Sequence, residues 1–404
     1  MSAARRGVIP ALTLEARIKR RLRAHLRELG FVRSDAGLLN PPASTKEALR
    51  SLHRIQRASR LKAHGPFIGD RLPQLIKYFA SGSEVHADAI KPRLQLIKSD
   101  TQEADLFRLA SLTWSVPVSQ GYGRRMRFLV WDESNDKLIG LIALGDPPFN
   151  IRTRDDYIGW NPADRKMRLV DTMDAYVLGA VPPYNLLLGG KLVACLVRSQ
   201  EIRQTFNERY GSAKGIISRK RKHASLVLVT TSSALGSSSV YNRLKLAGLR
   251  YFEPIGFTAG WGHFHIPDDL FDDIRTYLER HKHRDAAGNE FGDGPNWRLR
   301  AIKSAFQLIG LDPDLLRHGA QRQVFACQLA SNALRVLRGD SSVARYGSLL
   351  SAQEVGRLAI ERWMLPRSRR RPEYLAWKAE WVQQLLEPSL DGSISRGNRT
   401  ATVV

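Results

Sequence analysis

The sequence predicts an α/β fold in which a central mixed sheet is flanked by basic N-terminal and C-terminal helical regions. Strand-like apolar runs alternate with helical patterns between residues 113 and 285, whereas the segments on either side show helical patterns alone. The chain also carries 63 Lys and Arg against 39 Asp and Glu, a formal net charge of +24 at pH 7. An excess of this size predicts a polyanionic partner, and we expect nucleic acid.

The composition is that of an ordinary globular chain. Of the 404 residues, 43% are hydrophobic, which allows a sizeable core and more than one domain. Cys195 and Cys327 lie in apolar contexts that we interpret as helical, so we expect a reducing compartment without a disulfide framework. Because no run approaches ~20 consecutive apolar residues, we expect no membrane span and a cytoplasmic location.

Residues 1–112 are predicted to form a basic helical N-terminal region. Residues 12–29 place aliphatic side chains on one helical face and arginines over much of the rest. The capping-box pattern Ser44-Thr45-Lys46-Glu47 opens a second helix that ends near residue 60. Two further helical patterns follow at residues 72–80 and 104–112.

Residues 113–295 are predicted to form the α/β core. Two apolar runs, 127–131 and 137–144, are joined by a polar loop that is typical of a hairpin. Further along the core we expect strands at 171–178, 226–229, 251–255 and 261–266, and helices at 190–210, 238–247 and 270–282.

Residues 296–386 are predicted to form a C-terminal helical region. Its helical patterns cover 297–309, 321–338, 352–363 and 373–386, with breaks at Gly310, Gly339 and Pro366. Residues 387–404 are polar and contain Gly and Ser, so we expect a disordered tail.

The loop after the 226–229 strand is the first candidate site. Residues 230–239 are small and mostly hydroxylated, and a helical pattern follows them. Such a unit leaves backbone N–H groups unpaired at a helix N-terminus, where a phosphate binds well. We therefore expect phosphate contacts from Ser237, Ser238, Asn242 and Arg243; the alternative is an ordinary turn with a serine N-cap.

A second candidate is the turn Gly189-Gly190-Lys191, which precedes the 190–210 helix. Its glycines and lysine suit an anion, although the spacing of a nucleotide-hydrolysing P-loop is absent. The alternative is that the glycines allow close packing of helix and sheet. Residues 154–160 form a further polar loop, whose carboxylates either take part in a site or pair with its own arginines.

Possible metal-binding and catalytic residues follow two other strands. Asp146 comes after the 137–144 strand, and His263 and His265 would share one face of the 261–266 strand. We predict these three as ligands of Mg²⁺ or Mn²⁺, with Asp146, His265 and Tyr241 as catalytic residues. The alternatives are a turn aspartate and histidines satisfied within the strand.

Short basic clusters support binding to a phosphate backbone, which would be salt-sensitive and largely independent of sequence. The alternative for each cluster is a solvated charged face. In addition to Lys191 and Arg243, we predict contacts with nucleic acid from Arg124, Arg125, Arg219, Lys220, Arg221, Lys222, Arg298, Arg300, Arg369, Arg370 and Arg371.

As a set, these segments resemble a known family. The segments are LTWSVPVSQGYGRRMRFLV, KLIGLIALGDPPFN, RDDYIGW, PPYNLLLGGKLVACL, TTSSALGSSSVYNRLK, IGFTAGWGHFHIPD and GPNWRLR. In this order they resemble the DruA family of the Druantia anti-phage defence systems, over most of residues 105–380. The resemblance implies a bacterial cytoplasmic protein that acts in defence against phage.

A second resemblance concerns the fold alone. The hairpin and the strand–turn–helix that follows resemble the order of elements in GNAT-type N-acetyltransferases, where the turn after the fourth strand binds the cofactor pyrophosphate. Here the turn 185–190 reads Asn-x-x-x-Gly-Gly in place of Arg/Gln-x-x-Gly-x-Gly/Ala. Three functions follow: a DNA-binding protein with metal-dependent strand cleavage as its first candidate reaction, a GNAT-like acyltransferase, or a non-catalytic subunit that loads a partner helicase or nuclease onto DNA.

Overall fold

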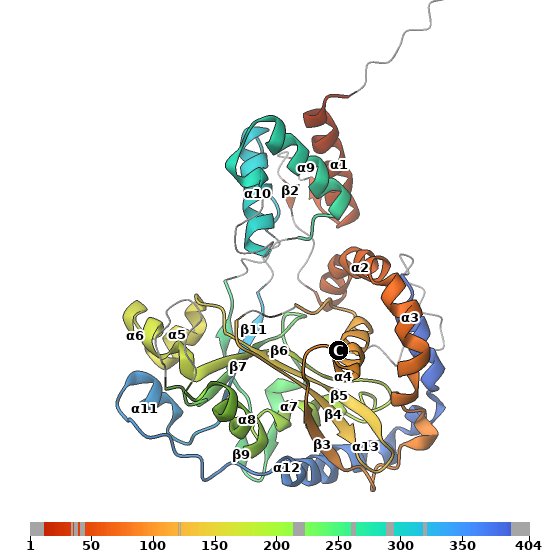
Figure 1. Ribbon diagram of the computed structural model, residues 1–404, viewed down its shortest axis with the longest axis vertical. Helices are drawn as coiled ribbons and strands as arrows, with labels where there is room; N and C mark the ends of the chain where they lie inside the picture. The colour runs from red at the N-terminus through yellow and green to blue at the C-terminus, as the bar shows by residue number, and fades with distance from the viewer. Residues whose placement is uncertain are drawn as a thin grey trace, which may run out of the picture. The chain divides into compact units, whose positions relative to one another are not determined.

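The computed structural model describes residues 12–33, 35, 39–40, 45–119, 121, 123–212, 223–259, 264–287, 295–317 and 321–388. The chain divides into two compact units, each made of two segments (Figure 1). The smaller unit combines Met1–Leu52 with Gly260–Ala320, and the larger combines His53–Ala259 with Gln321–Val404. This grouping differs from the consecutive regions 1–112, 113–295 and 296–386 expected above, because long-range contacts join the N-terminal helix to a segment that follows it by more than 200 residues.

The larger unit is built on one seven-stranded sheet, which confirms the predicted mixed α/β class. Strands β6 and β7 are parallel, and every other neighbouring pair is antiparallel. Across the sheet the order is β10 (Glu253–Phe257), β11 (Gln323–Gln328), β7 (Leu228–Ser232), β6 (Thr172–Ala180), β5 (Lys137–Gly145), β4 (Arg125–Asp132) and β3 (Pro92–Leu96). The predicted hairpin, β4–β5, is confirmed, whereas a GNAT-like relationship stays a prediction.

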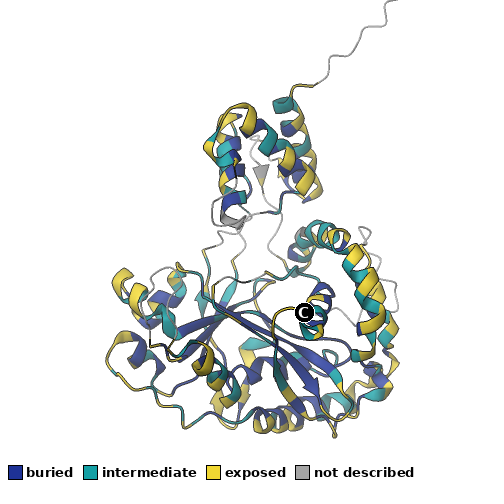
Figure 2. Ribbon diagram, in the orientation of Figure 1, coloured by how far each residue is buried: buried dark blue, intermediate teal, exposed yellow. Residues whose placement is uncertain are grey.

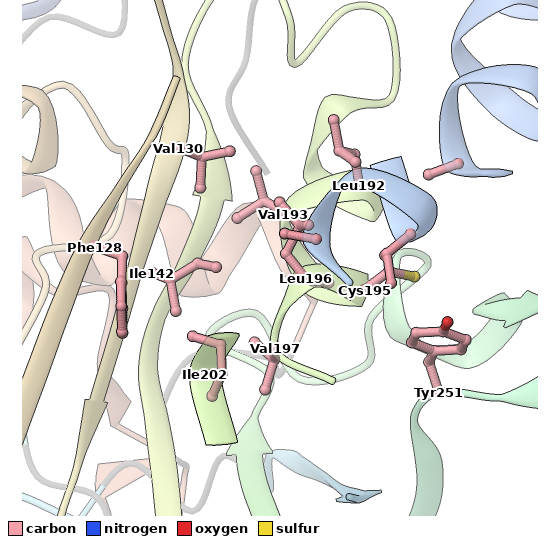
Figure 3. Close-up of a cluster of buried hydrophobic side chains, with 14 of the residues drawn as sticks. Phe128, Val130, Ile142, Leu192, Val193, Cys195, Leu196, Val197, Ile202 and Tyr251 are labelled. Carbon is pink, nitrogen blue, oxygen red and sulfur yellow. The ribbon is translucent and has the colours of Figure 1, made fainter. Parts of the chain in front are cut away.

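Helices cover both faces of this sheet because its central strands are apolar on both sides. On one face, α7 (Gly189–Leu196) packs Leu192, Val193 and Leu196 against the strand residues Phe128 and Ile142 (Figure 3). On the other face, α4 (Gln102–Leu112) packs against residues that alternate with those, including Leu129, Leu141 and Ala143.

Most of the predicted helices are present. Those expected near residues 12–29, 45–60, 104–112, 270–282 and 297–309 are confirmed as α1, α2, α4, α9 and α10. The helices not yet given are α1 (Leu14–Glu28), α2 (Lys46–Ala63), α3 (Gly65–Leu75), α5 (Arg152–Ile158), α6 (Pro162–Arg168), α8 (Gln200–Tyr210), α9 (Asp268–Arg280), α10 (Pro295–Leu308), α11 (Ala333–Arg338), α12 (Ala352–Ala359), α13 (Leu365–Arg370) and α14 (Val382–Leu385). None of the helices in the described ranges is long and apolar enough to cross a bilayer.

Two predicted helices are wrong. The helical part of residues 238–247 is only a 3₁₀ turn, Tyr241–Arg243, which begins where Ser238 Oγ accepts from the Tyr241 backbone N–H. Positive φ angles at Ala247 and Gly248 then turn the chain into the small ribbon of β8 (Lys245–Leu246) and β9 (Leu249–Arg250). The 321–338 segment begins as strand β11, which fills the position between β7 and β10, and only its end is helical. Cys327 therefore lies on a strand, fully buried like Cys195, and both thiols are free.

Two other predicted elements need smaller corrections. The 190–210 helix is divided into α7 and α8, since Ser199 leaves the helical conformation and accepts a hydrogen bond from the backbone of Ile202 at the start of α8. The described part of the predicted 261–266 strand, residues 264–266, is not a strand. Residues 389–404 of the predicted tail lie outside the described range.

Candidate nucleic-acid interface

The turn between β6 and α7 is held in place by a buried tyrosine. The Tyr184 hydroxyl donates to Oδ2 of Asp132 at 2.9 Å, and the Asn135 amide donates to the Tyr184 hydroxyl at 3.0 Å. Burial raises the pKa of Tyr184, and the Asp132 carboxylate raises it further, so the hydroxyl keeps its proton as a donor. This network anchors the turn to the β4–β5 hairpin and fixes where α7 begins.

The two glycines of this turn differ in what surrounds them. A Cβ at Gly189 would lie 2.6 Å from the backbone oxygen of Tyr184, so this glycine is required for close packing. A Cβ at Gly190 would meet nothing within 4 Å, so the first turn of α7 faces open space there. Close packing therefore explains Gly189, whereas Gly190 leaves access to the helix N-terminus beside Lys191.

Three cations from separate elements gather next to this helix start. Burial lowers the pKa of Lys191, and the positive charges of Arg243 and Arg362 lower it further. Lys191 Nζ also lies 5.2 Å from the centre of the Trp363 ring. None of these three cations, which we call the α7 cation cluster, forms an ion pair within the described part of the chain.

The hydroxyl-rich loop that follows β7 is closed mainly on itself. Ser238 Oγ accepts from the backbone N–H groups of Val240 and Tyr241, both at 3.2 Å. The amides of Asn242 and Gln323 bond reciprocally at 3.0 and 3.2 Å, which ties the loop to β11. Ser238 and Asn242 are thus used in the fold, whereas Ser237 and Arg243 are exposed.

A partly buried carboxylate that the sequence analysis missed, Asp174, lies beside this loop. Thr230 Oγ1 donates to Asp174 Oδ1 at 2.9 Å, and the paired strand residues are direct neighbours across β6 and β7. Burial raises the pKa of Asp174 to about 6, despite the hydrogen bond from Thr230 and the charge of Arg154. The sequence did contain one sign of this site, because Asp174 is the acidic residue of the largely apolar strand TMDAYVLGA.

Tyr241, a predicted catalytic residue, lies near this carboxylate. Burial raises the pKa of Tyr241, and the charge of Asp174 raises it further. Its ring packs against Phe252 and Phe325, with centroids 5.3 and 5.2 Å away. A tyrosine that holds its proton this firmly acts as a hydrogen-bond donor at neutral pH and is a poor nucleophile without a base.

Asp146 and Arg124, both predicted site residues, bind each other. Asp146 Oδ1 accepts from Arg124 Nε at 2.6 Å, and Oδ2 accepts from the Arg124 backbone N–H at 3.0 Å. The same guanidinium donates to the backbone oxygens of Val170 and Thr172. Together they join the ends of β4, β5 and β6, and Asp146 accepts these bonds with the two oxygens that a metal ion would need.

The polar loop at 154–160 also pairs internally. The fully buried Arg154 contacts Asp155 Oδ1 at 2.6 Å, and Arg165 contacts Asp155 Oδ2 at 2.7 Å. This bears out the alternative in which the carboxylates of the loop neutralise arginines. The buried pairs position α5 and α6 and leave Asp155 with no lone charge for a ligand.

In the smaller unit, His265 and Arg298 contribute to local packing. The backbone oxygen of His265 lies 2.7 Å from Nε2 of the buried His25, and Arg298 forms an ion pair with Asp268 at 2.8 Å. Arg300 also has an interaction partner. His263 lies outside the described residues, and within them no group of three His, Cys, Asp or Glu side chains could hold a metal ion.

The remaining predicted cations divide into three groups. In the run that ends α13, Arg370 and Arg371 bond to Pro366 O and Glu373, while Arg369 is exposed. Arg125 is exposed at the start of β4 and also has a partner. Arg219, Lys220, Arg221 and Lys222 lie outside the described residues.

Fold and site together define a mixed α/β protein in which cations without an ion pair in the described chain lie where helix α7 begins. The family model described as Druantia protein DruA matches residues 43–339. A protein named Druantia protein DruA from Escherichia coli (strain UMEA 4076-1) is 56% identical over 365 residues, which cover 90% of each chain. The chain belongs to the DruA family, as its sequence motifs predicted. No solved structure matches it.

Proposed function

We propose that this protein binds DNA through its sugar–phosphate backbone, at the α7 cation cluster. The observation that carries the proposal is the position of Lys191 at the start of α7: it shares the Trp363 ring with Arg362, the charges of Arg243 and Arg362 act on it, and none of the three has a carboxylate partner in the described chain. Like charges held together cost stability unless an anion offsets them. A phosphate at the N-terminus of α7 would meet all three charges and the positive end of the helix.

The wider charge of the protein supports a polymer rather than a single small anion. A net charge of +24 is far more than one phosphate group needs. The naming of the E. coli relative as a Druantia protein supports a setting in anti-phage defence. In that setting the bound DNA would be presented to a partner helicase or nuclease.

The test is salt-dependent binding of labelled plain DNA by the full-length protein. Lys191→Gln/Arg243→Gln/Arg362→Gln should weaken binding at least ~10-fold at low salt and reduce the slope of log K against log salt by about 2–3. The matched control is Lys98→Gln/Lys166→Gln/Arg335→Gln, which removes three exposed charges elsewhere on the larger unit. If both triple variants bind alike, or the wild type binds no DNA at low salt, the proposal falls.

Strand cleavage is the second candidate, and the raised pKa of Asp174 next to Tyr241 favours it. A carboxylate with a pKa near 6 is suited to accept a proton at neutral pH. The binding reactions should therefore also be read for nicking with and without Mg²⁺ or Mn²⁺. Loss of nicking in Asp174→Asn with DNA binding retained would support catalysis, whereas no nicking under any condition would leave a DNA-binding subunit.

The acyltransferase alternative is separated from both by its ligand. The strand–turn–helix of β6 and α7 would place the pyrophosphate of an acyl-CoA at the same cations. Thermal stabilisation by acetyl-CoA, together with absence of DNA binding, would favour this alternative. Stabilisation by plain DNA that acetyl-CoA does not compete away would exclude it.

A further inference from the structure

Helix α1 of the smaller unit carries two different sets of arginines. Arg17 and Arg21 point to α9 and form ion pairs there with Asp269 and Asp273; the Arg17–Asp273 pair spans 2.6 Å. Arg20, Arg23 and Arg27 are exposed and form no ion pair within the described residues. The acidic residues at the start of α9 thus neutralise one side of α1 and leave the other side charged.

The three unpaired arginines share one face of the helix. Their spacing of three and four residues places them along a single stripe, which extends over about 10 Å of the helix axis. The opposite face is anchored by Ile18, Leu22 and Leu26, which are 0%, 1% and 3% exposed. Figure 2 shows this division between buried and exposed residues along α1. The arginine stripe is therefore held outward by a well-packed helix.

A short ribbon follows α1 in the chain. Strand β1 (Val32–Arg33) begins four residues after the helix and pairs with β2 (Leu39–Asn40). Val32 is 66% exposed and Arg33 is exposed, although strand side chains usually bury at least one face. An exposed apolar side chain next to an unpaired arginine is suited to contact a sugar edge and a phosphate.

We infer that the arginine stripe of α1, with Arg33 on the adjoining ribbon, is a second nucleic-acid site, which binds the groove of double-stranded DNA. The inference rests on the proposed DNA binding and adds the form of DNA that is recognised. A helix about 10–12 Å across fits the B-DNA major groove, which is about 12 Å wide. Single strands instead need aromatic stacking surfaces, and α1 contains no Phe, Tyr or Trp.

The test compares duplex and single-stranded DNA of equal length, bound by the full-length protein. Arg20→Gln/Arg23→Gln/Arg27→Gln should weaken duplex binding at least ~10-fold and reduce its salt slope by about 2–3, while single-strand binding changes little. The same positions changed to lysine should keep most of the salt slope, because lysine retains the charge. Lys98→Gln/Lys166→Gln/Arg335→Gln is again the matched control, and thermal unfolding checks that each variant is folded.

The outcomes distinguish the α1 site from the α7 cation cluster. Unchanged duplex binding in the α1 glutamine variant overturns the inference, and so does an equal loss for duplex and single strand. If polyglutamate displaces the protein from duplex as effectively as unlabelled duplex does, the site is one for acidic polypeptides and the inference falls. Loss of duplex binding in the α1 variant but not in the α7 cluster variant would support the inference and overturn the proposed cluster site. Failure of the wild type to bind DNA would overturn both.

Discussion

Replacing Asp174 by asparagine is expected to stabilise the protein at neutral pH. Burial raises the pKa of Asp174 from 3.8 to about 6, so the folded state holds this proton more tightly than the unfolded state does. The carboxyl therefore costs no stability below pH 3.8, and its cost grows as the pH rises towards 6 and is complete above it. Asparagine keeps an oxygen for the Thr230 hydroxyl and cannot ionise.

The size of the effect follows from the two pKa values. A difference of about two between folded and unfolded pKa corresponds to about 3 kcal/mol in the free energy of unfolding once the carboxyl is fully ionised. At pH 5, where the unfolded carboxyl is ionised but the folded one is mostly protonated, the cost is about 1.5 kcal/mol. Asp174→Asn should thus gain about twice as much stability at pH 7.5 as at pH 5.

Urea denaturation of both proteins at pH 5 and pH 7.5 measures these differences. Asp156→Asn is the control, because Asp156 is exposed and its one ion pair among the described residues is with Arg152, one helical turn away. It should change the free energy of unfolding by less than ~0.5 kcal/mol at either pH. An Asp174→Asn gain that is the same at both pH values, or a loss at pH 7.5, would refute the reasoning.

Four further substitutions test how the α7 turn is built. Gly190→Ala should leave stability unchanged or raise it by up to ~1 kcal/mol in thermal unfolding, because its Cβ meets nothing within 4 Å. Gly190→Glu should fold equally well yet weaken DNA binding about 10-fold in a fluorescence titration, since it brings a negative charge to the α7 cation cluster; binding equal to that of Gly190→Ala would contradict this. Gly189→Ala should cost about 1–3 kcal/mol in urea denaturation, because its Cβ would lie 2.6 Å from the Tyr184 oxygen, and a stable variant would show that the turn can shift. Tyr184→Phe should cost about 1–3 kcal/mol by the same measurement because the buried Asp132 loses a donor, and Phe128→Leu serves as a control that removes no hydrogen bond.

Several elements could be predicted because their sequence pattern agrees with their final environment. The β4–β5 hairpin has two apolar runs and a polar loop, and α1 has an uninterrupted apolar stripe. The 321–338 segment failed because QVFACQ is short and apolar, and a short apolar run fits a buried strand and a helix equally well. The segment is a strand because it pairs with β7 and β10, and the periodicity of the sequence does not show these pairings.

The candidate site was predicted only in part for the same reason, because contacts between distant segments are not visible in the local sequence pattern. The sequence pointed to Lys191, Arg243 and Tyr241 on separate segments, and the structure brings the two cations together. Asp174 was missed because a single carboxylate in a strand has no spacing pattern, and its meaning comes from its neighbours in β7. Asp146 and Arg124 were predicted as independent functional residues, yet each is the other's partner across 22 positions of the chain.

By itself, the sequence determined the fold class, the family and the large positive charge, because each follows from composition, local pattern or ordered motifs. Only the tertiary structure decided which cations remain available to a ligand. Arg17 and Arg20 are alike in sequence, but one pairs with α9, about 250 residues away, and the other does not. The physical reason is that neutralisation of a charge depends on the side chains that folding brings within a few ångströms of it.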